Sequence, residues 1–146
     1  MIAQTIQLAL APVFVLVAIG NIMNILSARL GRVVDRSRAL QGEHATTSGM
    51  DHDELVREIR SIDKRIVIIG RAIALLVISG LVVGLTVAVL FLEELAGIDL
   101  QAVAAGTFLV AIGLLMAALL LFLRETQLAA ASLRIPEALL ELDRKL

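Results

Sequence analysis

Long apolar stretches alternate along the chain with shorter stretches that are rich in charge. Residues 1–28 contain no charged side chain, residues 66–92 contain only Arg71, and residues 100–123 contain none. A helix needs about 20 mainly apolar residues to cross the hydrocarbon core of a bilayer, and each stretch is long enough. The pattern therefore predicts an all-α membrane protein with three transmembrane helices. The predicted spans lie at residues 6–28, 68–92 and 100–123.

Each predicted span continues into an amphipathic stretch without a proline or turn cluster at the junction. Leu30, Val33 and Leu40 form an apolar stripe after the first span, and Leu55, Ile59 and other apolar residues form one before the second. Spacings of three and four residues are typical of helices. We therefore expect cytoplasmic helical parts at residues 29–41, 52–67 and 124–146.

These amphipathic parts have two possible arrangements. They can lie flat on the lipid headgroups, or they can stand upright and pack on each other as a coiled-coil stalk. Lying flat requires a bend at each junction, where Gly31 and Gly70 are the residues that allow one. Because sharp bends usually have an identifiable cause, we favour the upright stalk.

Several residues are typical of helix ends. Asp51 is a good N-cap for the second helix, with Glu54 three residues later as in a capping box. Gly97 is predicted as the C-cap of that helix, and Asp99 as the N-cap of the third. Pro136 should interrupt the third helix, which leaves a short last helix, PEALLELDRKL.

All 13 Lys and Arg residues lie in three patches, at 29–38, 57–71 and 124–145. Because cytoplasmic flanks of membrane helices are enriched in these residues, we expect the loop at 42–50 and the C-terminus to be cytoplasmic and the N-terminus to be outside. The basic residues follow the first apolar stretch, which disfavours a cleaved secretory signal. The same patches would attract anionic lipids at the cytoplasmic face.

Asn21 and Asn24 lie within the first predicted span. An unpaired amide in hydrocarbon costs several kcal/mol, so each must face protein or water. Two interpretations stay open: a polar pathway along the axis of an assembly, or a helix–helix contact in which the amides hydrogen-bond. The stripe that carries the amides consists of Phe14, Val17, Asn21, Asn24, Ala28, Gly31, Asp35 and Arg38.

Small residues recur in the second and third spans and indicate helix packing. Gly80 and Gly84 form a GxxxG pair, and Gly106 and Gly113 lie seven residues apart. Such positions allow close approach of helices, although GxxxG alone is a weak signal. Two glycine-bearing helices and one amide-bearing helix offer more contact surface than three helices need. Self-association into a homo-oligomer is therefore expected.

Other candidate chemistry is sparse. The chain has no cysteine, and it contains no phosphate-binding loop, catalytic constellation or metal-ligand spacing. We therefore expect no enzyme activity, no cofactor, no metal and no nucleic-acid partner. His44 and His52 flank the loop, and we expect them to be solvated side chains and not metal ligands. Arg71 either extends to the headgroups or pairs within the bundle, with Asp35 or a carbonyl.

Three stretches of the chain resemble a known family. They are LAPVFVLVAIGNIMNILSARLGRVVDRSRAL near the N-terminus, DELVREIRSIDKRIVIIGRAIALL in the second helix and LLLFLRETQLA at the end of the third. They are similar to a bacterial membrane family catalogued as domain of unknown function 2721. The resemblance implies a small three-helix protein of the bacterial inner membrane and implies no activity or site residues.

Two functional hypotheses follow from these observations. The first is a homo-oligomeric channel-like or pore-like assembly with the first helix near the axis. The second is a non-conducting membrane scaffold or regulatory subunit that binds an unknown protein partner through its cytoplasmic helices.

Overall fold

The computed structural model describes residues 2–132, which form three α-helices and no strand. Helix α1 spans Ile2–His44, α2 spans Met50–Ala96 and α3 spans Gln101–Ser132. All three are long and apolar enough to cross a membrane. The all-α architecture expected from the apolar stretches is thus confirmed. The predicted break at Pro136 and the short last helix lie outside the described residues.

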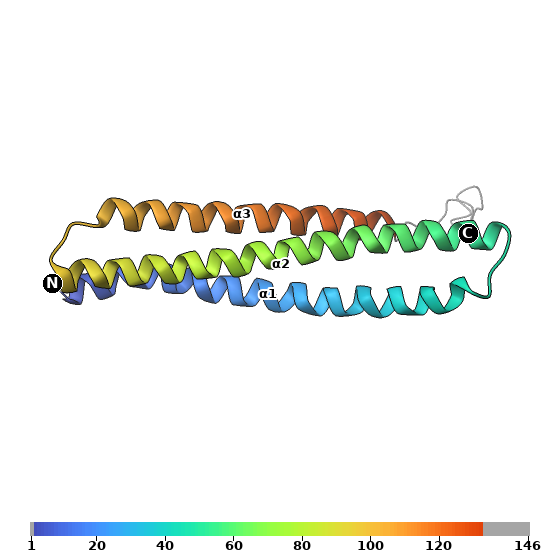
Figure 1. Cartoon of the computed structure of the whole chain (residues 1–146), viewed down its shortest axis with the longest axis horizontal. Helices are drawn as coiled ribbons and strands as arrows, with labels where there is room; N and C mark the ends of the chain where they lie inside the picture. Colours follow the sequence, from blue (N-terminus) through green and yellow to red (C-terminus); the bar gives the residue numbers. More distant parts are fainter. Residues whose placement is uncertain (1, 133–146) are drawn as a thin grey trace, which may run out of the picture.

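The three helices run side by side, with α2 between α1 and α3 (Figure 1). Neighbouring helices are antiparallel, and the α1–α2 and α2–α3 connections lie at opposite ends of the bundle. Both α1 and α3 pack extensively on α2, whereas they contact each other at few points. Helix α2 is therefore the element on which the other two are positioned.

Helices α1 and α2 are continuous through the junctions between their apolar and charged parts. Neither Gly31 nor Gly70 interrupts its helix. Helix α1 also contains Pro12, which is buried and cannot donate a backbone hydrogen bond. The apolar and amphipathic stretches of each helix therefore form one long element.

Buried side chains repeat every seven residues along each helix. Seven-residue spacing keeps one face of a helix toward its partner when helices cross at a small angle. In α1 the series contains Thr5, Pro12, Ile19, Leu26, Val33 and Leu40; in α2 it contains Leu55, Ile62, Ile69, Leu76 and Val83, with Ala72, Ser79 and Thr86 beside it; in α3 it contains Ala104, Ala111, Ala118 and Glu125. The core thus extends over both the apolar and the amphipathic stretches.

Small residues and hydroxyl groups join α2 to α3. Ser79 Oγ donates a hydrogen bond to the carbonyl oxygen of Ala111 at 2.7 Å, and Thr86 Oγ1 donates one to Thr107 Oγ1 at 2.9 Å. Such bonds satisfy polar groups that would otherwise be buried without partners. The alanines of α3 allow the two backbones to approach closely enough for them to form.

The helix ends match one of the three expected caps, the C-cap at Gly97. Gly97 adopts a left-handed conformation with φ 65° and its N–H donates to the Glu93 carbonyl, so it is the C-cap of α2. Asp99 Oδ1 accepts a hydrogen bond from the backbone N–H of Gln101, the first residue of α3, while the Leu100 carbonyl accepts the first helical hydrogen bond, from Ala104. The prediction that Asp51 caps α2 is wrong. Gly49, with φ 74°, precedes a helix that already includes Asp51, whose carboxylate favours the first turn through the helix dipole.

Candidate functional site

A buried ion cluster joins all three helices at one level of the bundle. Glu125 of α3 has no exposed side-chain surface, and its two carboxylate oxygens accept hydrogen bonds from arginines on different helices. Arg29 of α1 contacts Oε2 through Nη1. Arg65 of α2 donates to Oε1 twice, from Nη2 at 2.9 Å and from Nε at 3.0 Å. Glu125 is therefore held at both oxygens by charge-assisted hydrogen bonds.

Further contacts fix the Arg29 side chain between α1 and α3. Its Nη1 also donates to Thr126 Oγ1 at 3.3 Å, and its guanidinium carbon lies 5.2 Å from the centre of the Phe122 ring. A guanidinium within about 6 Å of an aromatic ring centre is attracted to the ring face. These contacts connect α1 and α3, the pair of helices that otherwise meet least.

The ion cluster lies where the apolar stretches end. Arg29 is the first charged residue after residues 1–28, Arg65 directly precedes the stretch 66–92, and Glu125 follows shortly after residues 100–123. Two arginines against one carboxylate leave the cluster with a net positive charge. The Arg29 and Arg65 side chains are 28% and 20% exposed, so this excess charge retains some access to the surroundings.

Sequence reasoning did not identify this cluster. Glu125 lies in the stretch LLLFLRETQLA, two residues after the predicted span, where the sequence alone indicates a charge exposed to water. The missed signal is its spacing, because Glu125 follows Ala111 and Ala118 at intervals of seven residues and continues their buried line. A charge at such a position requires partners from the neighbouring helices.

The polar stripe predicted on the first helix lies on the outer surface of α1. Asn21, Asn24, Asp35 and Arg38 are all exposed. Asn21 is two residues from the buried Ile19, so it points about 200° away around the helix, on the side opposite the core. Among residues 2–132, neither Asp35 nor Arg38 forms an ion pair. The described part of the chain therefore brings these residues onto one face of α1 but gives them no partner on α2 or α3.

Of the four glycines expected to pack helices, one does so within the chain. A Cβ atom placed on Gly80 would lie 3.8 Å from Leu16 and 4.0 Å from Ile19 of α1. The other three, Gly84, Gly106 and Gly113, are exposed, and a Cβ on each meets open space. Residues 2–132 therefore make no helix packing at those three positions, and such packing stays a prediction.

Other ionisable residues near the α1–α2 loop make surface contacts. Arg36 pairs with Glu58 of α2 at 2.8 Å, and the hydrogen bond that Arg36 donates to this carboxylate raises the pKa of Arg36. The rings of His44 and His52 lie 4.7 Å apart between centroids. Within the described residues no group of three potential ligands surrounds a metal position.

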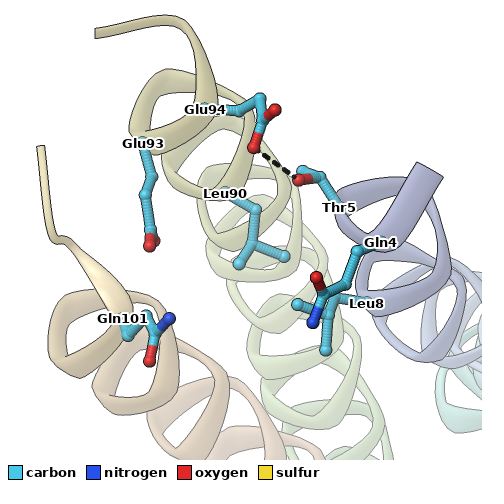
Figure 2. Close-up of a pocket in the computed structure, with 7 residues that line it drawn as sticks. All are labelled: Gln4, Thr5, Leu8, Leu90, Glu93, Glu94 and Gln101. Atoms are coloured by element: carbon cyan, nitrogen blue, oxygen red, sulfur yellow. Dashed lines mark hydrogen bonds between the residues drawn. The ribbon is translucent and has the colours of Figure 1, made fainter. Parts of the chain in front are cut away.

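A polar pocket lies at the other end of the bundle, beside the α2–α3 loop (Figure 2). Its volume is about 240 Å³, which has room for several water molecules. Glu94 accepts a hydrogen bond from Thr5 Oγ1 at 3.1 Å, whereas Glu93 Oε2 is buried without a hydrogen-bond partner among residues 2–132. The lining residues are Gln4, Thr5, Leu8, Leu90, Glu93, Glu94 and Gln101. The pocket can hold water or a small polar group against Glu93.

The described part of the chain thus defines a helical protein of the membrane-spanning type, with three long apolar helices and an ion cluster at the end of its apolar region. The chain belongs to the family described as Protein of unknown function (DUF2721), whose model matches residues 9–135. This match confirms the family resemblance found in the sequence. No curated protein and no solved structure matches the chain.

Proposed function

We propose that the protein assembles in a membrane as a homo-oligomer, with α1 near the axis and its outer face lining a pore-like centre. The observation that carries the proposal is the outward position of Asn21 and Asn24 on an apolar part of α1. An amide exposed to hydrocarbon costs several kcal/mol. In a single chain within a membrane both amides would face hydrocarbon. In an assembly around α1 they face other copies or water instead, so this cost is avoided.

A second copy of the chain suits this face better than lipid does. The exposed stripe repeats with alternating steps of three and four residues, which is the spacing of a helix–helix seam. Water on the axis can hydrogen-bond the Asn side chains, and Asp35 of one copy can pair with Arg38 of another beyond the apolar part. Ala28 and Gly31 lie between these groups and allow close approach.

A non-conducting scaffold is the second candidate. Phe14 and Val17 continue the same stripe toward the N-terminal end, and they are 70% and 58% exposed. If the stripe faces an axis, these bulky apolar side chains narrow it, and an apolar constriction can exclude water. The assembly would then present its charged helices to a protein partner without conducting ions.

Replacing both asparagines distinguishes amides that line a conducting axis from amides that join the copies. We expect the double variant Asn21→Leu, Asn24→Leu to remain assembled in nanodiscs and to lose the ion flux of the reconstituted wild type, because leucines at these positions make the axis apolar. Particle mass and flux into vesicles are the two measurements. The matched control is Ile25→Leu, an exposed apolar position on the same helix, which should change neither.

The outcomes discriminate between the candidates. Loss of assembly in the double variant would mean that the amides join the copies, at about 1 kcal/mol or less for each hydrogen bond, and do not line a wet axis. A wild-type protein that assembles but passes no ions at any voltage or pH would leave the scaffold as the function. A strictly monomeric wild type would overturn the pore-like assembly and leave a scaffold or regulatory subunit that binds a partner.

We further propose that the protein lies in the bacterial inner membrane with the α1–α2 loop in the cytoplasm. This orientation is supported by the position of the Lys and Arg residues, which lie on both sides of that loop and near the C-terminus and not beside the α2–α3 loop. Because the chain has no cysteine, single cysteines report on each side.

Labelling of intact cells tests this orientation. We expect an impermeant thiol reagent to label Ala96→Cys and to leave Ser48→Cys unlabelled until the cells are opened. Both positions are exposed in the structure, so a difference in labelling reflects the side of the membrane. Labelling of position 48 with protection of position 96 would reverse the proposed orientation.

A further inference from the structure

A groove of about 490 Å³ lies along α3 beside α2, and its lining changes from apolar to polar along its length. The apolar lining residues belong to the apolar stretches 66–92 and 100–123, and the polar ones follow directly after the end of residues 100–123. The lining consists of Leu75, Ala117, Leu120, Leu121 and Leu123, with Arg124 and Gln127 at the polar end. A ligand that fills this groove must be apolar along most of its length and polar at one end.

Arg71 places a second cation beside the groove. It is exposed, and it lies one helical turn from Leu75, so the two side chains share a face of α2. It is also the only charged residue in the apolar stretch 66–92. A charged residue within such a stretch is costly unless it reaches a counter-charge or the headgroup layer.

The described part of the chain offers neither Arg71 nor Arg124 a carboxylate. Among residues 2–132, neither residue forms an ion pair. The buried carboxylate at this level of the bundle, Glu125, already accepts hydrogen bonds from Arg29 and Arg65. Arg124 therefore lies at the polar end of the groove and Arg71 beside its α2 wall, and among residues 2–132 neither has a protein anion to pair with.

We propose that the groove is a binding site for an anionic phospholipid, with the phosphate between Arg71 and Arg124 and an acyl chain along Leu75 and Leu120. Guanidinium groups bind phosphate oxygens through paired hydrogen bonds, and the groove supplies an apolar surface next to them. The site lies on α2 and α3, away from the outer face of α1. It therefore does not depend on the proposed self-association.

A second copy of the chain fits this groove less well. An identical chain packed on the same face would bring further Arg71 and Arg124 side chains toward these two, and like charges repel. Free phosphate would satisfy the arginines but would leave the apolar surface unused. An anionic phospholipid supplies both the negative charge and the apolar chain in one molecule.

The sequence allows a direct measurement of lipid in the groove. The chain has no tryptophan and no tyrosine, so Leu120→Trp introduces a single fluorescent reporter at an exposed lining position. In vesicles of phosphatidylcholine, brominated phosphatidylglycerol should quench this tryptophan at a several-fold lower mole fraction than brominated phosphatidylcholine. Near an anionic lipid surface each arginine contributes about a fivefold preference.

Substitutions in the same reporter background identify the residues responsible. Arg71→Gln together with Arg124→Gln should bring the preference for phosphatidylglycerol close to one, while quenching by brominated phosphatidylcholine persists and shows that the groove is intact. The matched control is Arg32→Gln, an exposed arginine of α1 near the same level, which should keep the preference. Equal loss in the control and the double variant would overturn the site.

Two further results would also overturn the proposal. Displacement of brominated phosphatidylglycerol by excess inorganic phosphate would assign the arginines to free phosphate instead of lipid. A tryptophan that no brominated lipid quenches, in protein with the helical content of the wild type, would mean that protein covers the groove. We expect quenching to be stronger with the anionic lipid than with phosphatidylcholine. Excess inorganic phosphate should not reduce this preference, and the Arg71 and Arg124 double variant should lose it.

Discussion

Glu125→Gln should lower the free energy of unfolding by about 3 kcal/mol, because it leaves the Arg29 and Arg65 charges without their shared carboxylate. Breaking a buried ion pair by removing one partner costs about 3–5 kcal/mol. We expect the lower end of that range because both arginines keep partial exposure. Glutamine keeps the shape of the side chain, so the effect reports the charge. Unfolding in mixed micelles with increasing dodecyl sulfate, followed by circular dichroism, measures it.

The matched control is Glu58→Gln, which removes the partner of Arg36 from a pair that is exposed on both sides. Exposed pairs contribute at most about 1 kcal/mol, so this variant should unfold nearly as the wild type does. A Glu125→Gln protein as stable as Glu58→Gln would contradict the role given to the ion cluster.

A triple variant keeps this test decisive if Glu125→Gln fails to fold. Replacing Arg29, Arg65 and Glu125 together with methionine removes every charge of the cluster at once. Apolar replacement of a whole buried ion cluster is often neutral or stabilising by about 1–4 kcal/mol. Recovery of folding in the triple variant would assign the defect to unpaired charge, and continued failure to fold would assign it to lost packing.

Most of the fold could be predicted from the sequence because its signals are local. Each apolar stretch is long enough to define a helix, and the absence of proline at the junctions near Gly31 and Gly70 implies continuity. Gly97 was recognised as a cap because only glycine readily adopts the left-handed conformation there. Asp51 was assigned wrongly because Gly49 begins the helix earlier, and no local signal distinguishes these two starts.

The candidate sites were less predictable because they depend on how helices face one another. The spacing of Asn21 and Asn24 defines a stripe on one helix, but only the structure shows that this stripe points away from α2 and α3. Burial of Glu125 depends on Arg29 and Arg65, which lie far away in the sequence and reach the same level through the antiparallel packing. Charge patterns along one helix do not reveal such a meeting.

The ion cluster depends on how α3 packs against α2 in the core. The Ala104, Ala111 and Ala118 line brings α3 close to α2 over the apolar region, and the same line then reaches Glu125. At that level the arginine side chains are long enough to reach a carboxylate between the helices. The close packing of α2 and α3 at the alanines therefore determines whether the ion cluster at Glu125 can form. A substitution of one of these alanines tests whether the packing and the ion cluster depend on each other.

Ala118→Leu should lower the free energy of unfolding by about 1–3 kcal/mol, because the added atoms have no space between α2 and α3. Ala118 is 1% exposed and belongs to the same hydrophobic core as the fully buried Ala72 of α2. A larger side chain here must push the helices apart near Glu125. We therefore expect Ala118→Leu and Glu125→Gln together to cost less than the sum of their separate effects, because neighbouring sites share the same contacts.

The control for this variant is Gly113→Ala on the same helix, where the new Cβ meets open space. Alanine favours a helix over glycine by about 1 kcal/mol, so this variant should be as stable as the wild type or more stable. Unfolding by dodecyl sulfate gives the free energy of unfolding of both variants, and the particle mass of each variant is measured in nanodiscs. If Ala118→Leu were as stable as Gly113→Ala, α2 and α3 would not pack closely through the alanine line. If Gly113→Ala kept its stability but reduced the particle mass, the exposed glycine face of α3 would be a contact between chains.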